Sequence, residues 1–318
     1  MTGSVHVKDT VPNHQDLLDA YTRVKPFVHR TPVFKSETLD QIAGCTLYFK
    51  CENLQKVGAF KYRGATNAVL QLSETERACG VATHSSGNHG QALAKAAQVN
   101  GIASNIVMPN NAPQVKVDAI KGYGGNVTFC EPTLAAREST LKKVLDQTGA
   151  VEIHPYNNYK IIAGASTAAQ EFLEQQTTLD ILLTPVGGGG LLSGTCLTAH
   201  YLNPNIEVWA AEPKNVNDAF LSLKAGKIIP APSTPTIADG LKTSLGSRNF
   251  KIIKEHVYGV LTCTEEEIIS AMKLIWQRLK LVVEPSSATV LAVVLKNPAL
   301  FHDKNVGLII SGGNIDTS

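Results

Sequence analysis

Short apolar runs alternate with longer Ala- and Glu-rich stretches along most of the chain. Such short runs are typical of strands, and the longer stretches favour helices. Strands are predicted at residues 47–49, 81–83, 105–108, 127–129, 181–183, 208–210 and 306–310, and helices include residues 91–99 and 168–176. This rhythm predicts an α/β fold whose parallel sheets are covered by helices.

In such sheets ligands bind beyond the carboxyl ends of the strands, so the informative positions are the turns that lead from a strand into a helix. One segment falls outside the rhythm. Residues 230–235 contain three prolines, which can continue neither a helix nor a central strand, and a surface loop is predicted there.

The composition is that of an ordinary globular protein. Of 318 residues, 43% are hydrophobic and 18% are charged, and this length suggests about two domains. Lys and Arg total 29 against 27 Asp and Glu, a net charge of +2, and no dense basic run is present. The charge pattern therefore argues against a nucleic-acid or membrane partner.

The cysteines and the N-terminal segment indicate a cytoplasmic location. Six cysteines are scattered without a CxxC pair, which argues against a zinc ribbon and suits a reducing compartment. The first residues are polar and lack the apolar core of a signal peptide. No apolar run approaches the ~20 residues that cross a bilayer.

Three turns follow predicted strands. Residues 85–91, SSGNHGQ, could bind an anion at the start of a helix, although simple capping explains the same residues. Residues 187–190 are four glycines that could present backbone amides to a phosphate, and the alternative is a flexible loop. They match neither a P-loop nor a dinucleotide fingerprint. Residues 311–314, SGGN, could simply end a strand.

Six segments, in this order, resemble one family: ENLQKVGAFKYRGA, THSSGNHGQA, PVGGGGLLSG, AAEPKNVNDA, EPSSA and SGGN. They are similar to fold-type II pyridoxal-phosphate (PLP) enzymes, and within these to the serine racemase and serine/threonine dehydratase family, especially its eukaryotic-type racemases. The resemblance covers nearly the whole chain.

The resemblance implies a tryptophan synthase β-like fold of two open, twisted parallel-sheet domains with PLP in the cleft between them. The large domain would comprise residues 1–72 and 157–318, and the small domain residues 73–156. The family also suggests a homodimer.

The resemblance assigns Lys61 to the Schiff base with PLP and Ser86 to the opposite face of the ring. Spacing alone would not select Lys61, because a lone lysine is usually solvated. A Schiff base needs a lysine that can be neutral, and burial lowers the pKa of a lysine. The residues implied for cofactor binding are Phe60, Lys61, Asn88, Gly187, Gly188, Gly189, Gly190, Leu191 and Ser311.

Ser311 would face the pyridine nitrogen. A hydroxyl cannot hold that nitrogen protonated as a carboxylate could, and the weaker electron sink favours reprotonation or loss of a β-hydroxyl over transamination. The residues implied around the substrate carboxylate are Ser85, Asn88, His89, Gln91 and Arg137.

A divalent-cation site is implied at Glu212, Asp218 and the carbonyl of Val216. Oxygen ligands suit Mg²⁺, Mn²⁺ or Ca²⁺. From the sequence alone, this acidic pair would be interpreted as solvated.

The chain departs from the animal racemases at Tyr156, at Thr243 and at residues 164–167, and these changes blur the choice of substrate. The animal enzyme's activator site for ATP is matched only in part. Its matching positions are Lys56, Gln91, Tyr123, Lys280 and Asn314, whereas Val57 and Glu37 do not match. Glu37 would add negative charge where a nucleotide binds.

The function expected from these features is serine racemisation, together with dehydration of L-serine, and also of D-serine, to pyruvate and ammonia. The rival substrates are L-threonine and threo-3-hydroxyaspartate. A β-replacement enzyme and a non-catalytic PLP-binding protein are the alternatives from other classes.

Overall fold

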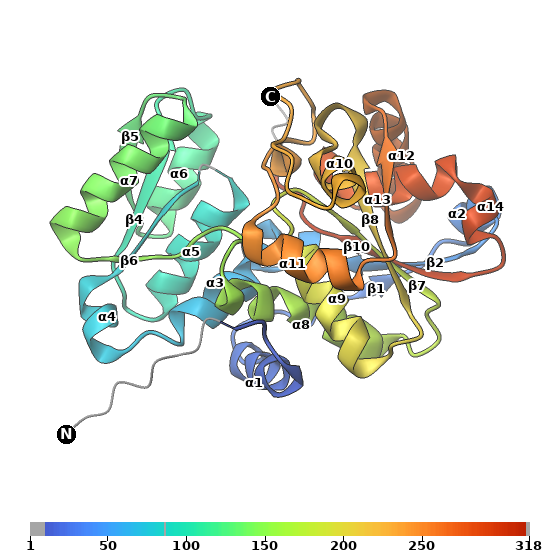
Figure 1. Cartoon of the computed structure of the whole chain (residues 1–318), viewed down its shortest axis with the longest axis horizontal. Helices are drawn as coiled ribbons and strands as arrows, with labels where there is room; N and C mark the ends of the chain where they lie inside the picture. Colours follow the sequence, from blue (N-terminus) through green and yellow to red (C-terminus); the bar gives the residue numbers. More distant parts are fainter. Residues whose placement is uncertain (1–9, 86, 316–318) are drawn as a thin grey trace.

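The computed structural model describes residues 10–85 and 87–315. Its strands form two sheets in two lobes, drawn left and right in Figure 1. One sheet has the order β1-β2-β10-β7-β8-β9 and the other β5-β4-β3-β6. The strands are β1 (Val33–Phe34), β2 (Thr46–Cys51), β3 (Val81–His84), β4 (Ser104–Pro109), β5 (Asn126–Cys130), β6 (Val151–Glu152), β7 (Ile181–Pro185), β8 (Glu207–Pro213), β9 (Gly259–Cys263) and β10 (Asn305–Ile310).

Helices cover both sheets. The α-helices are α1 (His14–Val24), α2 (Glu37–Ala43), α3 (Lys61–Val69), α4 (Glu74–Cys79), α5 (Asn88–Val99), α6 (Gln114–Gly122), α7 (Leu134–Thr148), α8 (Tyr159–Gln175), α9 (Gly190–Leu202), α10 (Asp218–Ala225), α11 (Ser247–His256), α12 (Glu265–Leu279), α13 (Pro285–Lys296) and α14 (Pro298–Phe301). The 3-10 helices are η1 (Glu52–Leu54), η2 (Lys56–Gly58), η3 (Lys214–Val216) and η4 (Asp239–Leu241).

The α/β prediction is confirmed. All seven predicted strands lie inside β2, β3, β4, β5, β7, β8 and β10. The strand pairings are parallel except that of β1 with β2. The predicted helices belong to α5 and α8, and residues 230–235 form a loop that is largely exposed.

Each sheet is the middle layer of three. Alternate residues of a strand point to opposite faces, so Val208 of β8 packs with α8, α9 and α11 while Ala211 packs with α12 and α13. In the smaller sheet, Ile106 faces α3, α5 and α6, whereas Val107 faces α7. The smaller sheet runs from β3 to β6, inside the segment predicted for the small domain. The domain boundaries themselves stay a prediction.

Helix α3 joins the two units. It packs on α8 and α5, and the α3–α8 crossing is close enough that a Cβ at Gly164 would lie 2.6 Å from the Cα of Gly64. Gly164 is therefore the residue that this crossing needs in the divergent segment 164–167. The crossing fixes the position of Lys61, the first residue of α3.

A network of buried ion pairs anchors α3 through Arg63. Arg63 binds Glu52 at 2.7 Å and Glu171 at 3.1 Å, and Lys50 also pairs with Glu171. All four side chains are buried. Removing one member of such a network would leave a buried charge uncompensated, which is strongly destabilising.

Within the two described segments, no helix combines the length and the apolar character that crossing a membrane requires.

Candidate active site

Lys61 stands at the meeting point of the two units. Its Nζ donates a hydrogen bond to the carbonyl of Pro155 at 2.8 Å and lies 5.2 Å from the centre of the Phe60 ring and 5.9 Å from that of Tyr156. Loss of hydration lowers the pKa of Lys61 to about 8, against the opposing effect of the Glu284 carboxyl. A substantial fraction of the amine is therefore neutral near pH 8, as a nucleophilic lysine requires.

The four glycines form a crowded turn that leads from β7 into α9, and Gly190 is the first residue of the helix. A Cβ at Gly188 would meet the Tyr156 ring at 2.4 Å, and one at Gly187 would meet the Cα of Leu241 at 2.9 Å. Gly189 has a φ of +93°, which other residues rarely adopt. The turn is buried and well packed, which excludes the flexible-loop alternative. It leads into the first amides of α9, which lack partners inside the helix.

The turn after β10 lies beside the lysine segment. The Phe60 amide donates to the Ser311 carbonyl at 2.9 Å. The Ser311 hydroxyl is buried and lies 3.0 Å from the hydroxyl of Ser287, which donates its own hydrogen to the Gly312 carbonyl at 2.7 Å. Ser287 can then only accept from Ser311. The 311–314 turn thus joins the candidate site rather than merely ending a strand.

Asn88 begins α5 and links three turns. Its amide donates to both oxygens of Glu284, at 3.0 and 3.2 Å, and its carbonyl oxygen accepts from Asn314 at 2.9 Å. Glu284 is buried, and burial raises the pKa of its carboxyl to about 7, against the effect of the Asn88 hydrogen bond. Glu284 begins the EPSSA segment and had no predicted role.

The predicted substrate residues divide into two groups. His89 and Gln91 are buried in α5, and Ser85 accepts a hydrogen bond from the Gly87 amide at 3.4 Å. The Nε2 of His89 lies 2.9 Å from the Ile153 carbonyl, and burial lowers the pKa of this imidazole to about 3. Its Nδ1 is buried without a partner among the described residues. Ser86 lies outside the described residues.

Arg137 comes from a different element, α7. Its charge contributes to lowering the pKa of His84 at the end of β3, after desolvation. Its Nε is buried without a hydrogen-bond partner among the residues that the structure describes.

Glu212 and Asp218 are buried, not solvated. The Glu212 carboxylate accepts from the amides of Ala219 and Phe220 at 2.8 and 3.0 Å, and one Asp218 oxygen accepts from the Leu245 amide at 3.0 Å. Burial raises the pKa of Glu212 to about 8 and that of Asp218 to about 6. The other Asp218 oxygen has no partner among the described residues.

This pair fits a cation because two buried carboxyls lack a balancing positive side chain within the described residues and one oxygen is orphaned. Val216, whose carbonyl was the third predicted ligand, is buried in the adjoining η3. No group of three or more His, Cys, Asp or Glu side chains is placed for a metal within residues 10–85 and 87–315. Backbone or water oxygens would therefore complete the shell.

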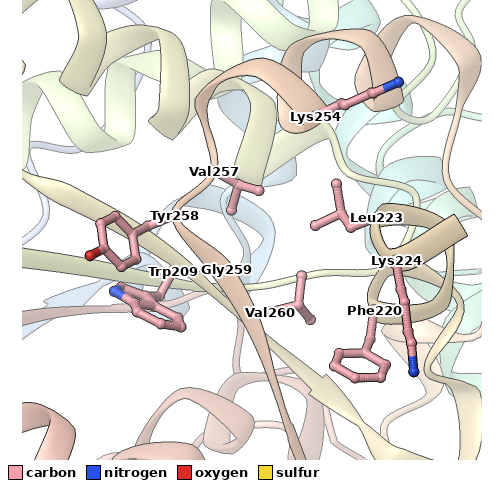
Figure 2. Close-up of a pocket in the computed structure, with 9 residues that line it drawn as sticks. All are labelled: Trp209, Phe220, Leu223, Lys224, Lys254, Val257, Tyr258, Gly259 and Val260. Atoms are coloured by element: carbon pink, nitrogen blue, oxygen red, sulfur yellow. The ribbon is translucent and has the colours of Figure 1, made fainter. Parts of the chain in front are cut away.

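A separate cavity of about 430 Å³ opens at the β9 edge of the larger sheet (Figure 2). Its lining shares no residue with the Lys61 group. The lining residues are Trp209, Phe220, Leu223, Lys224, Lys254, Val257, Tyr258, Gly259 and Val260.

Known proteins of similar sequence show the family to which this chain belongs. Residues 24–312 match the family described as "Pyridoxal-phosphate dependent enzyme". The chain belongs to this family. It is 53% identical over 310 residues to a serine racemase of Dictyostelium discoideum, covering 96% of this chain and 95% of that protein. It is 49% identical over 306 residues to a beta-hydroxyaspartate dehydratase of Paracoccus denitrificans, covering 96% and 97%.

Solved structures agree. The crystal structure of the Dictyostelium serine racemase superposes with a TM-score of 0.92 at 52% identity and covers 96% of this chain and 99% of its own. The crystal structure of a T.th. threonine deaminase gives a TM-score of 0.92 at 40% identity and covers 96% and 100%. The predicted family and the fold-type II class are confirmed.

The residues of this PLP enzyme fit the cofactor. An amine of lowered pKa, a glycine turn with no room for a Cβ, and a buried serine hydroxyl all converge on α3 and its neighbours. These groups were predictable from their motifs. The pairing of Glu284 with Asn88 was not, because 196 positions separate the two residues.

Several side chains at the positions matched to the ATP site are engaged in contacts with other residues of the chain. Lys56 donates to the Phe27 carbonyl and Lys280 to the Gln277 carbonyl, whereas Tyr123 lies under Lys95. Asn314 touches the site through Asn88. ATP binding stays a prediction.

Proposed function

We propose that this PLP enzyme is a serine racemase that also dehydrates serine to pyruvate and ammonia. The observation that carries the proposal is the 53% identity to a serine racemase over nearly both full lengths, with Lys61 and the glycine turn in place. Racemisation and dehydration share their first step, removal of the α-proton. One site can therefore perform both.

In this proposal Lys61 is the lysine that attaches the cofactor, and the amides of residues 187–191 hold its phosphate. Phe60, Asn88 and Ser311 surround the ring. When bound, PLP withdraws electrons from the substrate Cα, which makes the α-proton acidic and the β-hydroxyl easier to expel. When PLP is bound, the Ser311 hydroxyl would turn its hydrogen from Ser287 to the pyridine nitrogen, which then receives a neutral hydrogen bond and no negative charge.

In this proposal two residues transfer protons, one on each face of the PLP ring. Lys61, once released by the substrate, is the base on one face, and its pKa of about 8 lets it accept and return a proton near neutral pH. Ser86 is proposed for the other face. Neutral His89 cannot donate from its bare Nδ1 and serves as a hydrogen-bond acceptor.

A dehydratase of threo-3-hydroxyaspartate is the second candidate. It is favoured by the 49% identity to the beta-hydroxyaspartate dehydratase. A guanidinium with an unpartnered Nε among the described residues, that of Arg137, would suit the additional carboxylate of this substrate. L-threonine remains the third substrate to test, since a threonine deaminase shares the fold at 40% identity.

The remaining features of the proposal concern the whole protein. A divalent cation, Mg²⁺, Mn²⁺ or Ca²⁺, would bind at Glu212, Asp218 and the Val216 carbonyl, and ATP is the proposed activator. The protein would be a cytoplasmic homodimer. Residues 73–156 would form its small domain, and residues 1–72 and 157–318 its large domain. Sedimentation analysis would test the dimer directly.

The deciding experiment incubates the pure holoenzyme with L-serine, L-threonine and L-threo-3-hydroxyaspartate, and assays oxo acids and D-amino acids. The proposal expects pyruvate and D-serine from L-serine, with neither formed by Lys61→Ala. Turnover of hydroxyaspartate alone would favour the second candidate, and turnover of none would refute both.

A further inference from the structure

Residues 239–246, here called the 239–246 segment, pack against the glycine turn. Gly187 is packed so closely on it that a Cβ would meet the Leu241 Cα at 2.9 Å. At the end of the segment, the Gly246 amide donates to the Gly188 carbonyl at 3.1 Å. The position of the glycine turn therefore depends on the position of this segment.

The same segment touches other parts of the site. The Leu245 amide donates to Asp218 of the candidate cation pair, and the Gly240 amide donates to the Ser286 hydroxyl at 3.1 Å. Burial raises the pKa of Tyr156, whose ring covers Gly188, and the Thr243 side chain acts on the same hydroxyl in the opposite direction. Two of the chain's departures from the animal racemases, Tyr156 and Thr243, thus meet here.

At its beginning the segment contacts the other unit of the molecule. Asp239 forms an ion pair with Lys116 at 2.9 Å, and their side chains are 49% and 24% exposed. Lys116 lies on α6, which packs on the four-stranded sheet, whereas Asp239 begins η4 beside the larger sheet. The charges of both residues act on the buried carboxyl of Glu284.

An ion pair this exposed contributes little to the stability of a fold. Its geometric effect is larger here because it joins two separately packed units at the segment that supports the glycine turn. Catalysis depends on exact placement of the reacting groups, so a small loosening at this point is expressed in turnover.

We propose that Lys116 and Asp239 are positioning residues of the active site, whose ion pair holds the four-stranded unit against the 239–246 segment and so keeps the glycine turn in place. The inference rests on the proposed function, because its test measures turnover of L-serine.

The test is a charge-swap cycle on the holoenzyme. Lys116→Gln and Asp239→Asn should each lower kcat/KM for pyruvate formation about threefold to fivefold, the scale of a partly exposed ion pair. The double variant should be no worse than either single one, because both remove the same interaction. Lys116→Asp combined with Asp239→Lys should restore kcat/KM to within about twofold, by re-forming the pair.

A second readout is salt dependence. Raising NaCl from about 0.1 M to about 1 M shortens the screening length from about 10 Å to about 3 Å. This should lower kcat/KM more in the wild type than in Lys116→Gln, which has no pair to screen. The matched control is Lys296→Gln, which breaks a similar exposed pair with Glu267 at 3.0 Å that joins α12 to α13. It should leave kcat/KM unchanged.

The inference would be overturned by single variants as active as the wild type, or by losses that add up in the double variant. Failure of the swap to restore kcat/KM, or an equal loss in Lys296→Gln, would also overturn it. The failure of the proposed function looks different. In that case the wild type would form neither pyruvate nor D-serine from L-serine, whereas a wrong inference leaves a wild type that still forms pyruvate.

Discussion

Burial sets what each titratable residue near Lys61 can do. It lowers the pKa of the Lys61 amine to about 8 and that of His89 to about 3. The charged forms of both are disfavoured because little water reaches them. Near neutral pH Lys61 can exchange a proton, whereas His89 cannot. The sequence motifs located both residues, and the packing explains why only Lys61 can exchange a proton near neutral pH.

The first prediction concerns the pH dependence of Lys61. An amine attacks an aldehyde only when it is neutral, and a pKa of about 8 means that protonation limits it below that pH. When PLP is added to apoprotein, the rate at which the absorbance of the Schiff base appears should therefore rise about tenfold per pH unit below 8 and level off above it. Lys61→Ala should recover none, and a wild-type rate still rising steeply at pH 10 would show an ordinary, solvated lysine.

The second prediction concerns Ser86. Loss of a positioned proton donor costs about 10²–10⁴-fold in rate. Ser86→Ala should therefore lose conversion of L-serine to D-serine and attack on D-serine, while it keeps substantial pyruvate formation from L-serine, whose α-proton is proposed to face Lys61. If Ser86 only caps its helix, the variant will instead lose thermal stability and both activities together.

Most of the predicted strands lie in the interior of a sheet. Six of the seven are interior strands of their sheet, whereas β5 is the edge strand of the four-stranded sheet and is mostly unburied. Strands β1 and β6 have two residues each, and β9, at the sheet edge, carries Gly259 and Thr262. These short or mixed sequences give no apolar signal. The α3–α8 crossing at Gly64 and Gly164 depends on tertiary packing, which no local pattern records.

The glycine turn between β7 and α9 yields the third prediction. Gly188→Ala places a Cβ 2.4 Å from the Tyr156 ring, and overpacking of this kind typically costs about 1–3 kcal/mol. The PLP dissociation constant should rise about tenfold or more. Gly122→Ala on α6, where a Cβ meets nothing within 4 Å, is the control and should bind PLP normally. Equal affinities in the two variants would contradict a phosphate site in this turn.

The fourth prediction concerns the turn from β8 into α10. A cation that binds only the folded protein stabilises it by about 2.7 kcal/mol at a hundredfold excess over its dissociation constant. Added Mg²⁺ or Ca²⁺ should therefore raise the melting temperature of EDTA-treated protein by about 5 °C. Glu212→Gln should lose this shift, and Glu207→Gln, on the same strand, should keep it. A shift that survives Glu212→Gln would place the cation elsewhere.

At the scale of the whole molecule, the site exists only where the two units meet. Lys61 comes from the helix that both units share, Asn88 from the unit of the smaller sheet, and Glu284 and Ser311 from the unit of the larger one. Residues 88 and 284 are far apart in sequence, so their contact could be inferred only through a family resemblance. That resemblance supplied the motifs, and it left Glu284, Lys116 and Asp239 without roles.

The central claim is that one site removes the α-proton of serine on one face and returns a proton on the other. The most direct measurement incubates holoenzyme with L-serine in D₂O and follows the enantiomers by chiral chromatography with mass detection. The account predicts D-serine carrying deuterium at Cα, formed alongside pyruvate, and neither product with Lys61→Ala. Unlabelled D-serine, or D-serine formation that persists in Lys61→Ala, would contradict it.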